Sequence, residues 1–122
     1  MSATLRAVDP LPVRLFDVID GCAWNRLPDL FAKECVYERP GYDPIRGIAD
    51  LLRFYEHDRI ISRGHHQLSH LVQIEGLSAC WGTFRGVSRN QEPLEEQFAD
   101  TFELSADGYI LRRKTYFFRP AI

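Results

Sequence analysis

The second half of the chain consists of long segments in which polar and apolar residues alternate, separated by very short turns. The alternating segments are residues 66–74, 77–87, 93–104 and 109–120. A period of two places successive side chains on opposite faces of a β-strand. The connections, such as Glu75–Gly76, are too short for anything except hairpins between antiparallel neighbours. This pattern predicts four long strands in an antiparallel meander.

The first half has the spacing of amphipathic helices instead, with apolar residues recurring every three to four positions. The predicted helices are residues 13–20, 24–35 and 47–61. Gly21 can end the first helix, and residues 35–44 have the pattern of a short strand that stops at Pro40. We therefore predict a single α+β domain over residues 1–122, with three N-terminal helices packed on one face of a strongly curved antiparallel sheet.

Composition narrows the class of protein. Hydrophobic residues make up 45% and charged residues 26% of the 122 positions, which is typical of a soluble globular domain. The net charge is -2 without a cluster of Lys and Arg, so no nucleic-acid partner is expected. No apolar run approaches the ~20 residues of a membrane span, and the first residues lack the apolar core of a signal peptide. Three cysteines without metal-ligand spacing predict reduced thiols and a cytoplasmic location.

An acidic residue interrupts the apolar face of one predicted strand. Asp100 shares its face with Phe98 and Phe102. Burying a carboxylate is costly unless a cation pairs with it. The short turn after this strand sets a register that places Asp100 opposite Arg113, and alternation alone places both on the inner face. We therefore predict a salt bridge between them.

The other two turns extend this row across the sheet, because they place His70 opposite Trp81 and Trp81 opposite Asp100. The predicted inner rows are His70, Trp81, Asp100 and Arg113, then Leu68, Thr83, Phe98 and Thr115, then His66, Arg85 and Glu96. Several polar groups on one inner face are typical of a small-molecule cavity. Two structural alternatives remain open: the acid–arginine pair could simply close the sheet, and His70 could be a hydrogen-bonded core residue.

Three segments of the chain resemble a known family. "WNRLPDLFAKECVYERPG", "IRGIADLLRFY" and "FADTFELSADGYI" are similar to segments of the nuclear transport factor 2-like (NTF2-like, cystatin-like) superfamily, in particular the SnoaL-like polyketide cyclases and the ketosteroid isomerases. The resemblance implies that the curved sheet encloses a conical cavity. It also implies that Asp100 is a pocket residue and that the same cavity is lined by Trp81, Thr83, Arg113, Thr115 and Phe117.

The chain departs from the isomerases at two positions. Their general base is an Asp just before a Pro, where this chain has Arg39, or Glu38 if one loop residue is counted differently. Their first-helix tyrosine falls near Arg14 or Leu15, so a phenol donor is missing there. Steroid isomerisation is therefore not expected, and Arg113 in place of an apolar wall favours a polar or anionic ligand.

These observations predict a cofactor-independent enzyme, an isomerase, cyclase, lyase or epoxide hydrolase, of polyketide-like natural-product metabolism. Each of these reactions needs only proton transfer. The predicted catalytic residues are Asp100 as base or as the residue that orients one, His70 as proton shuttle, and Arg113. The predicted substrate-binding residues are Arg39, Tyr37, Tyr55, His66, Trp81, Thr83, Thr115 and Phe117. No metal is expected, because His65 and His66 alternate across a strand and cannot chelate one ion from one side.

Two other functions fit the same residues. The cavity could hold a ligand without turnover, or the outer face of the sheet could bind a partner. Phe84, Tyr116 and Phe118 alternate to that outer face beside Gln97 and Lys114. An exposed apolar patch of this kind usually marks an interaction surface. We therefore predict a homodimer through the convex face of the sheet.

Overall fold

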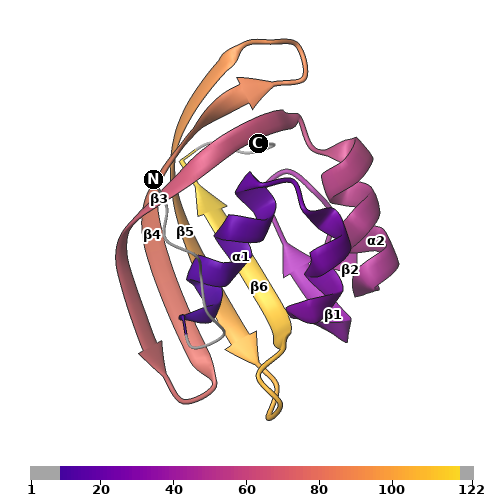
Figure 1. Ribbon diagram of the computed structural model, residues 1–122, viewed down its shortest axis with the longest axis vertical. Coiled ribbons are helices and arrows are strands. Elements are labelled where there is room, and N and C mark those ends of the chain that lie inside the picture. The colour runs from indigo at the N-terminus through magenta and orange to yellow at the C-terminus, as the bar shows by residue number, and fades with distance from the viewer. Residues whose placement is uncertain (1–8, 119–122) are drawn as a thin grey trace.

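The structure, a computed structural model, describes residues 9–118 and contains one curved sheet with helices packed against it (Figure 1). Its elements are α1 (Leu11–Asp20), the 3-10 helix η1 (Trp24–Asp29), β1 (Phe31–Glu38), β2 (Ile45–Arg46), α2 (Gly47–Arg53), the π-helix η2 (Phe54–Asp58), β3 (Ile61–Ile74), β4 (Leu77–Ser88), β5 (Pro93–Leu104) and β6 (Ile110–Phe117). None of the helices in this described part of the chain is both long and apolar enough to cross a membrane.

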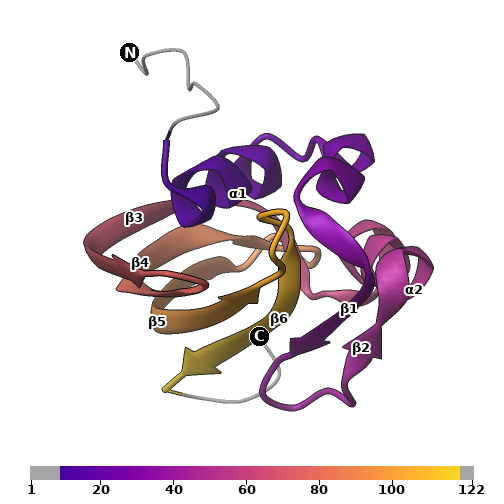
Figure 2. The ribbon, with the colours of Figure 1, turned by 90° about the horizontal axis from the view of Figure 1, so that it is seen from below.

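The sheet has six strands in the order β2-β1-β6-β5-β4-β3. Neighbouring strands are antiparallel, except that β1 and β6 run parallel. Strands β3 to β6 curl around the space beneath α1, which covers the concave face (Figure 2). The predicted α+β architecture and the meander of four long strands are therefore confirmed.

The predicted helix over residues 24–35 is wrong. Only η1 forms, and strand β1 begins at Phe31, which pairs with Ile110 of β6. The Ile110 amide donates to the Leu30 carbonyl at 2.8 Å. Pro28 lies inside η1 and lacks the N–H that a continuing helix needs, whereas pairing with β6 satisfies the following backbone. The third predicted helix, residues 47–61, is present as α2 followed by η2, and it ends at Asp58 before strand β3 begins at Ile61.

Strand β3 contains a bulge between Leu68 and His70. Gly82 lies opposite the bulge, and a Cβ at this position would be 2.0 Å from the Gln67 carbonyl oxygen. Only glycine lets the two backbones approach so closely. The bulge reverses the facing of side chains along β3, so that His66 points to the concave face while His70 points outward.

Strands β4 and β5 pair one residue away from the predicted register. Cys80, and not Trp81, lies opposite Asp100. The turn begins at Ser88 itself, whose amide donates to the Glu92 carbonyl at 2.8 Å and whose hydroxyl accepts from the Glu92 amide at 3.1 Å. A slip of one residue moves every side chain to the other face. The side chains of β4 therefore face opposite to the prediction.

Phe84 shows the consequence of this slip. It was expected on the outer face but lies in the core, 2% exposed. Its ring fills the space over Gly64 and Gly86, where a Cβ would lie 2.2 and 2.8 Å from ring atoms. Its ring centroid is also 4.7 Å from that of His66. The concave face of the sheet is thus packed with aromatic side chains.

Candidate active site

A carboxylate and a guanidinium meet on the concave face. Asp100 of β5 is fully buried, and Arg113 of β6 is 2% exposed. Arg113 Nη2 and Nε donate to Asp100 Oδ2 at 3.0 and 3.3 Å. The predicted salt bridge is therefore confirmed. The predicted register is not, because a bulge between Glu103 and Leu104 leaves Asp100 opposite Thr115.

A chain of hydrogen bonds connects the second oxygen of this carboxylate to another buried arginine. Thr115 Oγ1 donates to Asp100 Oδ1, and Tyr37 Oη lies 2.7 Å from Thr115 Oγ1. Arg39 Nη1 donates to Tyr37 Oη at 2.7 Å. Since Thr115 has one hydroxyl hydrogen and gives it to Asp100, Tyr37 must be the donor to Thr115. All of these bonds therefore point from Arg39 toward Asp100.

Tyr55 of η2 joins the cluster from the helical side. Arg113 Nη1 donates to Tyr55 Oη at 2.6 Å, which leaves the phenol hydrogen available for another acceptor. The Tyr55 ring stacks on Trp24 with 5.0 Å between centroids. Burial raises the pKa of Tyr55, and the charge of Arg113 opposes this only in part. The phenol therefore stays protonated at neutral pH.

Arg113 is a permanent cation in this cluster. Burial by itself would lower the pKa of Arg113, but the Asp100 charge and the nearby phenols outweigh burial and raise the pKa above its ordinary value. Tyr37 lies under the guanidinium, with 4.4 Å between the Arg113 Cζ and the ring centroid. A buried cation between a carboxylate and two phenol rings can stabilise negative charge that develops nearby.

A second polar pair on the concave face was not predicted from the sequence. Asp20, the last residue of α1, lies with Oδ1 2.6 Å from His66 Nδ1, and its Oδ2 accepts from the His66 amide at 2.8 Å. His65 Nδ1 is 3.4 Å from the same carboxylate. Helical spacing is the feature of the sequence that could have identified Asp20. It follows Phe16 by four residues and so continues the apolar face of α1.

The protonation of His66 follows from its surroundings. A carboxylate can only accept, so Nδ1 carries the hydrogen and Nε2 keeps a free lone pair. The ring is stacked on Phe16 at 4.3 Å and contacts Phe98 at 5.2 Å between centroids. Burial lowers the pKa of His66, although the hydrogen bond to Asp20 opposes this shift. The imidazole is therefore neutral at neutral pH and can accept a proton at Nε2.

One aromatic ring connects the two polar clusters. Phe16 stacks on His66, and the Arg113 Cζ lies 5.6 Å from the centroid of the same Phe16 ring. The Asp100–Arg113 pair is buried, whereas the side chains of Asp20 and His66 are 16% and 11% exposed. Charges interact more strongly in such surroundings than at the protein surface, and Phe16 separates a proton acceptor on one side from a cation on the other.

Three predicted site residues do not lie on the concave face. His70, Trp81 and Thr83 are exposed on the convex face, and His70 stacks on Trp81 with 5.0 Å between centroids. Their predicted positions are wrong because the bulge in β3 and the slip of β4 reverse the facing of both strands. Phe117 is half-buried, with the Arg39 Cζ 5.0 Å from its ring centroid.

The structure brings the other predicted residues together. Those that lie on the concave side with Asp100 and Arg113 are Tyr37, Arg39, Tyr55, His66 and Thr115. At the position left open between two residues, Arg39 is buried at 6% exposure, whereas Glu38 pairs with Lys114 in the sheet and lines a cavity on the outer face. The inward position before the proline therefore holds a cation.

Metal ligands and reactive thiols are two other kinds of group that could carry chemistry in the described part of the chain. No group of three His, Cys, Asp or Glu side chains within residues 9–118 is placed to hold a metal ion. Cys22, Cys35 and Cys80 are free. Burial, followed by the charge of Asp100, raises the pKa of Cys80 to about 12, so its thiolate is not populated at neutral pH.

Comparison with known proteins identifies the family. The model of the SnoaL-like domain matches residues 13–113. The chain belongs to the SnoaL-like domain family. No curated protein matches it in sequence.

Several solved structures share the fold of this SnoaL-like domain. An NTF2-like protein of unknown function from Exiguobacterium sp. 255-15 has a TM-score of 0.77 at 21% identity, covering 88% of this chain and 98% of that one. The epoxide hydrolase/cyclase-like enzyme SalBIII, which has a role in pyran ring formation in the polyether salinomycin, has a TM-score of 0.77 at 15% identity, with 88% and 87% covered. An LEH-like epoxide hydrolase of M. tuberculosis has a TM-score of 0.75 at 14% identity, with 88% and 79% covered.

Proposed function

We propose that this SnoaL-like domain is a cofactor-independent enzyme that transfers protons on a small organic molecule bound at the concave face. The observation that carries the proposal is the partly buried Asp20–His66 pair, one aromatic ring away from the buried Asp100–Arg113 pair. Such a pair of a carboxylate and a neutral imidazole is a general base held in one tautomer. The shared fold with an epoxide hydrolase/cyclase-like enzyme and an LEH-like epoxide hydrolase supports the same class of chemistry.

In this proposal His66 is the proton acceptor. Its Nε2 has a free lone pair, while Asp20 orients the ring and stabilises the imidazolium that forms. Asp100 is less suited to this role, because Oδ2 accepts twice from Arg113 and Oδ1 accepts from Thr115. Asp100 instead fixes the position of the Arg113 guanidinium.

Tyr55 is the matching proton donor. Arg113 donates to its oxygen, and the phenol hydrogen is free to point at an oxygen of the substrate. With a ketone, His66 removes the proton from the adjacent carbon, the C–H electron pair forms a C=C bond, and the C=O π pair moves to the oxygen, to which Tyr55 donates a hydrogen bond. With an epoxide, His66 takes the proton of the attacking hydroxyl or water while Tyr55 protonates the leaving epoxide oxygen. Isomerisation, cyclisation and epoxide opening thus use the same two groups.

Access to these groups requires movement. Asp100 is fully buried and Tyr55 is 2% exposed, with the Trp24 ring stacked on Tyr55 and the Phe16 ring over Arg113. A substrate must displace these side chains, and we expect its entry and release to limit turnover. Once closed, the same packing excludes water and strengthens the action of Arg113 on developing negative charge.

A general test does not require the natural substrate. Deuterium exchange of the α-protons of small cyclic ketones in D2O, followed by NMR, reports proton abstraction, and incorporation of labelled water into small epoxides reports ring opening. We expect His66→Gln to lower either rate by ~10²–10⁴-fold, as for the loss of a positioned base. Ser69→Ala, on the exposed side of the same strand, is the matched control and should react at the wild-type rate.

The alternative function is ligand binding without turnover, which the sealed position of Asp100 favours. The binding function would be favoured if the wild-type protein accelerated neither reaction. It would also be favoured if the His66→Gln variant reacted at the wild-type rate.

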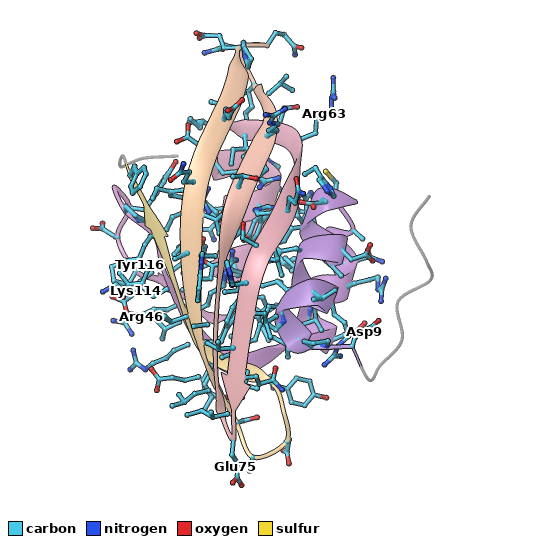
Figure 3. The ribbon with its side chains drawn as sticks, turned by 90° about the vertical axis from the view of Figure 1, so that its left-hand side faces the viewer. Asp9, Arg46, Arg63, Glu75, Lys114 and Tyr116 are labelled. Carbon is cyan, nitrogen blue, oxygen red and sulfur yellow. The ribbon has the colours of Figure 1, made fainter. Side chains whose placement is uncertain are left out.

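We further propose that the domain forms a homodimer through the convex face. Tyr116 and Lys114 project from the side of the sheet opposite α1 (Figure 3). Trp81, Tyr116 and Phe118 are 42%, 45% and 85% exposed and line a common groove of about 520 Å³. A second copy would cover these aromatic rings. Phe84, which was predicted to belong to this patch, is not part of it.

A further inference from the structure

Arg59 is a buried cation that has no hydrogen-bonded partner for its Nε in the described part of the chain. It directly follows η2 and is 3% exposed. Its Cζ lies 5.1 Å from the ring centroids of both Trp24 and Tyr55. Its Nε is completely buried without an acceptor. A buried donor without an acceptor is costly, and a charged one more so.

None of the ion pairs among residues 9–118 includes Arg59, although Asp58 and Glu92 line the cavity beside it. The groups whose charges act on it are Tyr55, Arg39, Cys22 and Tyr37. Burial lowers the pKa of Arg59 from its ordinary value, and Arg39 acts in the same direction. Arg113 lies in the same cluster but is bound by Asp100. Arg59 is therefore a buried cation without an ion-paired carboxylate among residues 9–118.

The backbone places this charge beside the candidate active site. The Arg59 amide donates to the Phe54 carbonyl at 3.0 Å, which closes the wide turn of the π-helix. Single π-turns of this kind are frequent at functional sites. The turn brings Arg59 over the face of Tyr55, whose oxygen accepts from Arg113.

A cavity next to Arg59 gives a small molecule room to approach. It measures about 520 Å³ and is lined by Arg59, Arg89, Ser88, Asn90, Ile60, Pro93, Leu94, Asp58 and Glu92. Arg89 is held in place there, because its Nε donates to the Arg59 carbonyl at 2.7 Å and its Nη2 to the Glu56 carbonyl at 3.2 Å. These two bonds use donors of Arg89, whereas the guanidinium of Arg59 retains its own.

We propose that Arg59 binds a carboxylate of the ligand, so that the substrate class of this domain is an organic acid. A carboxylate accepts two parallel hydrogen bonds from a guanidinium and supplies the charge that Arg59 lacks. The bound acid occupies the cavity beside Arg59, where Arg89 adds a second positive charge to the lining. That the bound acid is a substrate rests on the function proposed above, whereas the binding of an acid at Arg59 does not.

The test compares benzoate with benzamide, a neutral molecule of nearly the same size, on the full chain by isothermal titration calorimetry. We expect benzoate to bind the wild-type protein more tightly than benzamide. Arg59→Met should weaken benzoate binding by ~10-fold or more, the loss expected for a charge-assisted hydrogen bond, and leave benzamide unaffected. Arg85→Met removes the same charge from an exposed ion pair on β4 and should change neither affinity.

Thermal unfolding provides a second measurement that does not need tight binding. Without ligand, Arg59→Met should melt a few degrees higher than the wild type, because a buried charge without a counter-ion has been removed. Benzoate should raise the melting temperature of the wild type and not that of Arg59→Met. A lower melting temperature for the ligand-free variant would mean that Trp24 and Tyr55 already satisfy Arg59, and would overturn the proposal.

Equal affinity of the wild type for benzoate and benzamide would also overturn it, as would equal loss of benzoate binding in Arg59→Met and Arg85→Met. These measurements contain no turnover step. Failure of the carboxylate site is therefore distinguishable from failure of the proposed catalysis, which depends on His66.

Discussion

The two faces of the β4–β5 hairpin differ in the kind of residue that they bury. On the concave face, Asp100 is completely enclosed although it carries a charge. On the convex face, Trp81 is 42% exposed although it is the larger and more apolar side chain. Ala99 and not Asp100 lies opposite Trp81, so a single residue of register separates the two environments. The strand register decides which side chains point to the concave face. A charged side chain is tolerated there only where partners are present.

The concave face tolerates charge because its polar groups find partners. Each Asp100 oxygen accepts a hydrogen bond, and Arg113 supplies the opposite charge. The convex face has the opposite requirement, since its aromatic rings remain in water until another surface covers them. The Asp100–Arg113 pair is thus satisfied within one chain, whereas the aromatic rings of the convex face are exposed in it. The following changes test that contrast.

The largest effect is expected for Asp100→Ala. Its removal leaves the Arg113 charge buried without a counter-ion, which should lower the free energy of unfolding by ~3–5 kcal/mol. Glu103→Ala, on the exposed side of the same strand, should change it by no more than about 0.5 kcal/mol. Urea unfolding of both variants measures the difference. Similar losses of unfolding free energy in the two variants would contradict the proposed difference between the two faces.

A smaller loss is expected for Gly82→Ala, which tests how the register of β3 is maintained. The new Cβ would lie 2.0 Å from the Gln67 carbonyl oxygen, so the bulge opposite Gly82 must shift. We expect a destabilisation of ~1–3 kcal/mol, the usual cost of overpacking. Thr83→Ala, the exposed neighbour, is the control for the substitution itself. A fully stable Gly82→Ala variant would show that the bulge does not depend on this glycine.

The stability of the protein should depend on pH through His66. Its pKa in the folded state is lowered below the ordinary value of 6.5, mainly by burial. The unfolded chain therefore takes up the proton first as pH falls, and the free energy of unfolding should decrease below about pH 6.5 until the folded pKa is reached. Each unit of pKa difference corresponds to about 1.4 kcal/mol.

His66→Gln should remove this part of the pH dependence, which denaturant unfolding at several pH values would detect. His70→Gln, at an exposed position of the same strand, should leave it in place. A wild-type profile that is unchanged by His66→Gln would assign the acid sensitivity to other groups.

The smallest effect on the stability of one chain is expected for Tyr116→Lys, because this side chain is 45% exposed. The free energy of unfolding of the monomer should change by no more than about 0.5 kcal/mol. The oligomeric state should change from dimer to monomer, because a cation replaces an aromatic ring in the covered patch. Light scattering at micromolar concentrations separates the two states. A monomeric wild-type protein would contradict the proposed dimer directly.

The parts of the site that the sequence predicted depend on alternation alone. Asp100 and Arg113 each occupy inward positions of a regular strand, so their pairing survived an incorrect register. The parts that failed depend on where a turn begins or where a strand bulges. The turn after β4 begins at Ser88, through bonds to Glu92 that no pattern of apolar residues reveals. His70 and Trp81 were placed on the wrong face for these reasons.

By itself, the sequence determined the class of fold, the meander of long strands and the presence of a charged pair inside the sheet, because these follow from local periodicity and short connections. The tertiary structure alone decided which of the predicted site residues meet and which partner His66 has. Asp20 and His66 are 46 residues apart and meet only because α1 packs across the concave face. Likewise, the burial of Arg59 without an ion-paired carboxylate among residues 9–118 follows from the packing of distant segments. Contacts of this kind depend on packing between distant segments, and periodicity carries no information about them.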